Sequence, residues 1–188
     1  MRWWGGGGRP RFPRMTSGRT REGAGAAAAR PTLRIELKRT ADGRPSLACV
    51  REDASRTWAR VHPFLPTHDL THCAVESVLG IDDAFFGLIA QGWDIDDFAA
   101  PGVVKRLPAA ALCVEQVVGH IERAIAVDAE ALAEALALEA VRSGRAPCEA
   151  VRPDQLEAIR RLRGALLEAW RATPPGETLR ITFPVAPP

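Results

Sequence analysis

Histidine and carboxylate side chains recur at a helical interval in one short segment of this 188-residue chain. His68, His72 and Glu76 follow one another at intervals of four residues. On an α-helix this spacing places the three side chains on one face, one turn apart. Neutral imidazoles and carboxylates are typical ligands of zinc and similar divalent metals. The segment therefore predicts a divalent metal site with His68, His72 and Glu76 as candidate ligands.

The same segment contains residues that could act on water. A metal that keeps an open coordination position lowers the pKa of a water molecule bound there. We expect Asp69 to be the base that activates this water, and Glu76 to be the third ligand or the acceptor that orients His72. Asp69 and Glu76 are therefore the candidate catalytic residues. Two further histidines could approach the site: His120 from a later helix, as a metal ligand, and His62 from a proline-containing loop.

The cluster also has a purely structural interpretation. His68, near the start of a helix, can bond a neighbouring carboxylate, and His72 can be a boundary residue with satisfied hydrogen bonds. Glu76 can pair with Arg60 instead of contributing to a metal site. Under this interpretation the chain is a non-enzymatic binding or interaction module, in which residues 85–93 and the helices present an apolar groove.

Two known motifs share part of this pattern. Residues 68–72 read His-Asp-Leu-Thr-His, which is similar to the H-E-x-x-H motif of zinc metallopeptidases, with Asp69 in the place of the longer Glu. This similarity implies that His68 and His72 are ligands and that Asp69 is the base. The His68–Asp69 pair also resembles the dyad of HD-type phosphohydrolases, a family that is all helical.

A longer resemblance extends from His68 to Trp93. The segment reads H-D-L-x-H-x-x-V-E-x-x-L-G, followed by F-F-G-L-x-A-x-G-W. It resembles a group of small bacterial proteins that have no assigned activity. The resemblance therefore implies a bacterial, cytosolic origin and adds no mechanism.

Composition and charge narrow the class of protein. Hydrophobic residues make up 46% of the chain and charged residues 26%, which is typical of a folded globular protein. No apolar run approaches the roughly 18 residues that a membrane helix requires, which excludes an integral membrane protein. The net charge is +2, but residues 1–31 carry seven arginines and one glutamate, so the remainder has a net charge of −4. We therefore expect nucleic acid as a partner only through this basic segment, while a small-molecule or protein partner is left open.

The basic segment differs from the rest of the chain in composition. Residues 1–31 are rich in glycine, proline and arginine, and such a segment cannot bury enough apolar surface to offset the entropy of ordering. A disordered tail is therefore predicted there, and Met15 is an alternative start of translation. Residues 32–188 are predicted to form one domain.

Patterns of apolar residues divide this domain into strands and helices. Leu33, Ile35 and Leu37 alternate with charged residues, which predicts a strand with one buried face. Similar patterns predict strands over residues 46–50, 57–61 and 178–183. Helical periods and capping residues predict helices over about 68–79, 84–91, 108–125, 129–143 and 153–170. This order predicts an α+β fold, in which an antiparallel sheet of about four strands, three N-terminal and one C-terminal, packs against about five helices.

The four cysteines show no spacing typical of a metal or redox motif. They lie at positions 49, 73, 113 and 148, without a C-x-x-C pair and among apolar neighbours. This pattern predicts reduced thiols that act as small apolar core residues. The start of the chain lacks a secretory hydrophobic region, so we expect a cytoplasmic location.

Overall fold

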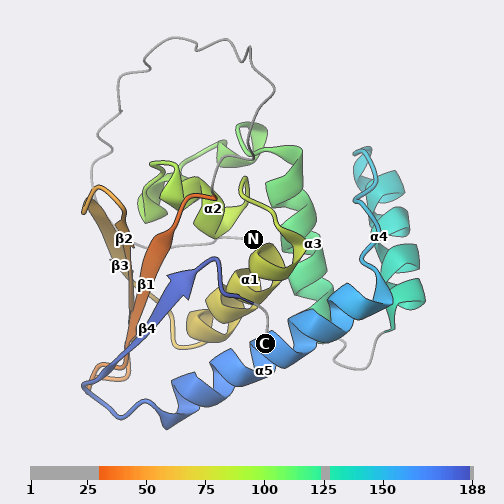
Figure 1. Ribbon diagram of the computed structural model, residues 1–188. Helices are drawn as coiled ribbons and strands as arrows, with labels where there is room; N and C mark the ends of the chain where they lie inside the picture. Colours follow the sequence, from red (N-terminus) through yellow and green to blue (C-terminus); the bar gives the residue numbers. More distant parts are fainter. Residues whose placement is uncertain (1–29, 124–127, 187–188) are drawn as a thin grey trace.

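The computed structural model describes residues 30–123 and 128–186 and shows an antiparallel sheet with helices packed on one side of it (Figure 1). The strands are β1 (Leu33–Lys38), β2 (Ser46–Arg51), β3 (Arg56–Arg60) and β4 (Thr178–Phe183). Their order in the sheet is β3-β2-β1-β4, and every neighbouring pair is antiparallel. The C-terminal strand thus pairs with the first strand, and the predicted α+β fold is confirmed. The predicted tail lies, except for residues 30 and 31, outside the described residues.

The buried face of the sheet is apolar because its inward positions alternate along each strand. Leu33, Ile35 and Leu37 of β1 are each at most 1% exposed. Ile35 lies opposite Cys49 of β2 on one side and opposite Ile181 of β4 on the other. These strands therefore present one continuous apolar layer to the helices.

The α-helices follow the first three strands in the sequence, and two short 3-10 helices lie between the second and the third of them. They are α1 (Leu65–Leu79), α2 (Phe85–Ala90), α3 (Ala109–Arg123), α4 (Ala129–Ser143) and α5 (Pro153–Ala172), with the 3-10 helices η1 (Ile95–Ala99) and η2 (Val103–Lys105). The first of them, α1, contacts α2, α3 and α5 and occupies the centre of the fold (Figure 1). Most of its residues are buried. Polar side chains on α1 are therefore buried as well, and such groups are costly unless they have partners.

The central helix begins earlier than predicted. It starts at Leu65, because Pro66 lies in the first turn, where a missing N–H removes no helical hydrogen bond. Thr67, the expected cap, lies inside the helix, and its carbonyl oxygen accepts a hydrogen bond from Oγ1 of Thr71 at 2.8 Å. Gly80 ends the helix as predicted, in the left-handed conformation with φ 70°.

The other helix boundaries follow the local sequence closely. Asp128 caps α4, since its Oδ1 accepts a hydrogen bond from the N–H of Ala131 at 2.8 Å. The 3-10 helices η1 and η2 were not predicted, because so few residues show no recognisable period. Within residues 30–123 and 128–186, no helix combines the length and the apolar character needed to cross a membrane.

The expectation of four reduced thiols is wrong for one pair of cysteines. Cys113 of α3 and Cys148, in the segment before α5, form a disulfide. Their separation of 35 residues carries no local signal, since the pairing depends on how α3 lies against that segment. Cys49 and Cys73 are free and buried, as predicted.

Candidate metal centre

Two helices bring three candidate metal ligands together. His68 and His72 lie on α1, Glu115 lies on α3, and one ligand atom from each lies within 4.8 Å of the others. Nε2 of His72 is 3.3 Å from Oε1 of Glu115. Two ligands placed about 2.1 Å from a tetrahedral ion are about 3.4 Å apart, so this pair already has the spacing of zinc ligands. The rings of His68 and His72 have centroids 4.7 Å apart.

A carboxylate lies at Nδ1 of each imidazole and orients the ring. Nδ1 of His72 lies 3.2 Å from Oε1 of Glu76, and Nδ1 of His68 lies 3.2 Å from Oε2 of Glu122. An acceptor at Nδ1 favours the tautomer that carries its proton there, which leaves Nε2 as the atom that can bind a metal. Both histidines therefore have the carboxylate partner that metal-bound histidines usually have.

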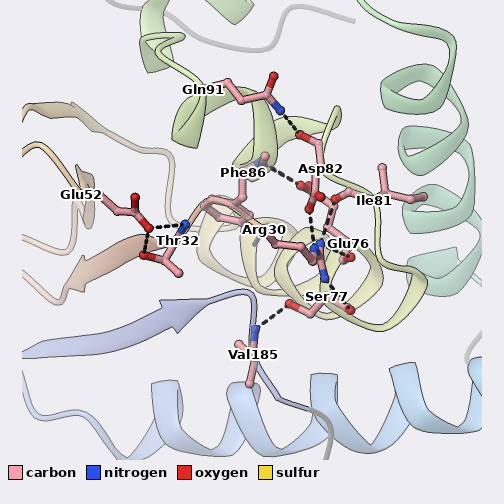
Figure 2. A network of polar contacts seen from close by, with 11 residues as sticks. Arg30, Thr32, Glu52, Glu76, Ser77, Ile81, Asp82, Phe86, Gln91 and Val185 are labelled. Atoms are coloured by element: carbon pink, nitrogen blue, oxygen red, sulfur yellow. Dashed lines mark hydrogen bonds and ion pairs between the residues drawn. The ribbon is translucent and has the colours of Figure 1, made fainter. Parts of the chain in front are cut away.

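Glu76 orients His72 and does not belong to the three-ligand group. It is fully buried, and its Oε2 accepts hydrogen bonds from the N–H groups of Phe86 at 2.9 Å and Gly87 at 3.1 Å. Figure 2 shows this carboxylate of α1 turned toward the start of α2. A Cβ at Gly87 would overlap the backbone of Asp82, so only glycine fits there. Of the two roles expected for Glu76, the geometry favours orientation of the ligand.

An arginine fixes the end of α1 that carries Glu76. Nε of Arg30 lies 2.5 Å from Oδ1 of Asp82, and its guanidinium donates to the backbone carbonyls of Glu76, Ser77 and Ile81 (Figure 2). A cation near the last carbonyls of a helix is favourable because these carry partial negative charge. The contact links the first described residue to the helix that supplies both histidines.

The charges in the cluster depend on burial and on neighbouring side chains. Burial opposes a charge on His72, but Glu115 and Glu76 outweigh it and raise the pKa of His72 to about 10. Burial raises the pKa of Glu76, against the opposing effects of His72 and two backbone N–H groups. Partial burial also opposes a charge on Glu122, yet His68 and His72 lower the pKa of Glu122. Without an ion, His72 is a cation between two carboxylates, and a metal must displace its proton.

Asp69, the predicted base, lies in a different environment. It is 2% exposed, and burial raises its pKa to about 8 despite the attraction of His72. Its Oδ2 makes no hydrogen bond to any of the residues that the structure describes. It does not line the cavity beside the ligands. Because it is enclosed and does not line the cavity, Asp69 is not placed to accept a proton from a water molecule bound beside the ligands.

The structure does not bring the other two histidines to the group. Nε2 of His120 lies 3.3 Å from Oε2 of Glu139 on α4. His62 is exposed and stacks on Phe64, with ring centroids 5.3 Å apart. No local pattern indicates Glu115 as a ligand, because it belongs to a different helix from the histidines and is brought to them by tertiary packing.

Comparison of the chain with family models, with curated proteins and with solved structures gives no match.

A cavity of about 710 Å³ adjoins the three-ligand group. His68 and Glu115 are part of its wall, whereas His72 lies behind them with 2% exposure. Glu122, which orients His68, also lines the cavity. The group is thus enclosed around His72 and borders the cavity through His68 and Glu115.

Proposed function

We propose that the protein binds a divalent metal ion of the zinc class through His68, His72 and Glu115. The observation that carries this proposal is the convergence of three ligand atoms within 4.8 Å from α1 and α3. The carboxylate at Nδ1 of each histidine supports it, since second carboxylates of this kind orient metal-binding imidazoles. Two histidines and one glutamate form a ligand set that is common in catalytic zinc sites.

We further propose that the site hydrolyses a small molecule held in the adjoining cavity. Three protein ligands leave a coordination position open, which is the arrangement of catalytic rather than structural zinc sites. An ion there would supply an acidified water. Glu122 is better placed than Asp69 to accept its proton, because Glu122 lines the cavity and Asp69 does not.

A second candidate function is binding without chemistry. The contacts of His72 with Glu76 and Glu115 favour it, because a protonated His72 between two carboxylates is satisfied without a metal. In that case the cluster stabilises the crossing of α1 and α3, and the cavity binds a ligand that the protein does not alter.

Metal content distinguishes these two functions. We would dialyse the purified protein against zinc, remove the excess, and measure bound metal by mass spectrometry in wild type, His72→Ala, Glu115→Gln and His120→Ala. His120 is the matched control, since it also pairs with a glutamate but lies outside the three-ligand group. We expect about one ion per chain in wild type and His120→Ala, and a large loss in the other two.

Circular dichroism spectra would establish that each variant is folded. The Glu115→Gln variant is the more informative one, because it keeps the size and shape of the side chain and changes only its charge. No zinc in the wild type, or equal zinc in wild type and Glu115→Gln, would contradict the proposed metal site and favour the structural cluster.

A further inference from the structure

We infer that the cavity beside the three-ligand group binds a small amphipathic anion, which has an apolar body and a single carboxylate or phosphate headgroup. The inference deepens the proposed function, since it names the class of substrate for the same site. Hydrolysis of the bound anion would depend on the metal site, whereas binding of the anion depends on the cavity alone.

The cavity has the size and much of the lining of a small-molecule site. Its volume of about 710 Å³ falls within the range of roughly 300–1,000 Å³ that is usual for such sites. Phe85, Phe98, Leu107 and Leu112 are among the residues that line it. The rings of Phe85 and Phe98 have centroids 4.7 Å apart, and the ring of Phe85 lies 5.7 Å from that of His72. An apolar surface thus reaches the ligand group and suits an apolar body.

The acidic side chains of the cavity wall all have histidine partners. Three glutamates line the cavity, and their contacts are Glu115 with His72 at 3.3 Å, Glu122 with His68 at 3.2 Å and Glu139 with His120 at 3.3 Å. Each carboxylate therefore has an interaction inside the protein. None of them requires a cation from a bound molecule.

The two arginines of the wall differ from the glutamates in this respect. Arg123, at the end of α3, and Arg145, just after α4, both line the cavity. In the part of the chain that the structure describes, no carboxylate lies within 4.0 Å of either guanidinium. A planar guanidinium matches the paired oxygens of a carboxylate or a phosphate. The two guanidinium groups are therefore the charged groups of this wall that have no ion pair among the described residues, and they are available to bind an anion.

Gly119 keeps one of these arginines against the cavity wall. A Cβ at Gly119 would lie 3.2 Å from Nη2 of Arg123 and 3.5 Å from its Cζ. The guanidinium of Arg123 thus rests on the bare backbone of α3 at the point where Gly119 itself lines the cavity. An alanine at position 119 would require this guanidinium to move by a few tenths of an ångström.

A pair of fluorescent probes separates the charge from the apolar body. Anilinonaphthalene sulfonate is an amphipathic anion, and phenylnaphthylamine has nearly the same aromatic body without the sulfonate. We would titrate both into wild type, an Arg123→Gln/Arg145→Gln double variant and an Arg142→Gln control. Arg142 lies close to Arg145 in the sequence, is exposed and does not line the cavity.

We expect the anionic probe to bind wild type and Arg142→Gln equally, and to bind the double variant about tenfold more weakly. The neutral probe should bind all three proteins alike. Octanoate or octyl phosphate should displace the neutral probe, and octanol should not. The more effective of the two anions identifies the preferred headgroup. Equal anionic-probe affinity in wild type and the double variant, or displacement by octanol as effective as by both anions, would overturn the inference.

The metal content of the same samples keeps the two proposals apart. Bound zinc together with an anionic-probe affinity that is insensitive to Arg123 and Arg145 would overturn the inference and leave the metal site standing. Arginine-dependent probe binding in a protein that holds no zinc would support the anion site and overturn the proposed metal function.

Discussion

Nε2 of His72 lies 3.3 Å from Oε1 of Glu115, and this contact joins α1 to α3 at the wall of the cavity. The side chain of His72 is 2% exposed and that of Glu115 is 29% exposed, so the imidazole is enclosed while the carboxylate reaches the cavity. A buried cation loses its hydration and must be compensated by neighbouring groups. The pair therefore has two possible states with comparable geometry: a protonated imidazole facing a carboxylate, or two ligands of one metal ion.

Zinc should stabilise the folded protein through this pair. A ligand that binds only the folded state raises the free energy of unfolding by about 2.7 kcal/mol when its concentration is 100 times its Kd. We expect thermal unfolding to move to higher temperature with added zinc and to return with a chelator. His120→Ala should show the same shift, whereas a shift that persists undiminished in Glu115→Gln would place the zinc elsewhere.

The metal-free protein should lose stability as the pH rises. The folded protein holds the protons of Asp69 and His72, among others, more tightly than the unfolded chain, because the pKa of Asp69 is raised from 3.8 to about 8 and that of His72 from 6.5 to about 10. Each group contributes fully to the free energy of unfolding below its pKa in the unfolded chain. The contribution is lost as the pH rises through its pKa in the folded protein. Urea unfolding in the presence of a chelator should therefore give a falling free energy of unfolding between about pH 4 and pH 10.

The Asp69→Asn variant isolates the first of these two protons. It has no carboxyl group to titrate, so its free energy of unfolding should change less than that of wild type between about pH 4 and pH 8. Above this range both proteins should still respond to His72. An identical pH dependence in the two proteins would show that Asp69 is ionised in the folded state.

Gly87 should tolerate no side chain, because its Cβ would overlap the backbone of Asp82. Gly87→Ala should lower the free energy of unfolding by about 1–3 kcal/mol, as overpacking usually does. It should also weaken zinc binding, since the N–H of Gly87 holds Glu76, which orients His72. Gly164→Ala in α5 is the control, since nothing lies within 4 Å of its added Cβ.

The two glycine variants should change the free energy of unfolding in opposite directions. Alanine in a helix is favoured over glycine by about 0.5–1 kcal/mol, so Gly164→Ala should be slightly stabilising. Urea unfolding and zinc titration of both variants test the argument. Equal stability and equal zinc affinity of Gly87→Ala and wild type would show that Glu76 does not depend on α2 for its position.

Reduction of the Cys113–Cys148 disulfide should destabilise the protein. The bond closes a loop across 35 residues of sequence, and restricting the unfolded chain in this way stabilises by about 3–4 kcal/mol. Urea unfolding with and without reductant measures the difference, and Cys113→Ser should match the reduced wild type. An unchanged midpoint after complete reduction would contradict this contribution.

The other two cysteines should be unreactive while the protein is folded. Cys49 and Cys73 are buried, and burial raises the pKa of both thiols well above the usual value. A thiol reagent should therefore label neither of them under native conditions and both after unfolding without reductant. Reductant should add Cys113 and Cys148 to the labelled set. Rapid native labelling of Cys73 would show that α1 is less enclosed than described.

The strands and the histidine pair could be predicted because their signals are local. Leu33 and Ile35 show the alternation of a half-buried strand in a few consecutive residues, and the interval from His68 to His72 is one helical turn. Glu115 could not be predicted, because its position depends on the packing of α3 against α1. Periodicity describes a single helix and gives no information on which helix lies beside it.

The burial of the site could not be predicted for a related reason. The spacing of His68 and His72 places both on one face of a helix but does not show how much of that helix is enclosed. In the structure α1 contacts α2, α3 and α5, and its apolar residues belong to the same core as those of the sheet. Most of its residues are therefore buried. This enclosure shields the carboxyl group of Asp69 from solvent and places that of Glu76 against the first N–H groups of α2.

X-ray absorption spectroscopy of the zinc-loaded protein tests the central claim most directly, because it measures the atoms bound to the ion. The account predicts two imidazole nitrogens and oxygen ligands, all at about 2.0–2.2 Å from zinc, and a changed spectrum in Glu115→Gln. A shell of sulfur at about 2.3 Å, or a spectrum without imidazole scattering, would contradict a site built from His68, His72 and Glu115.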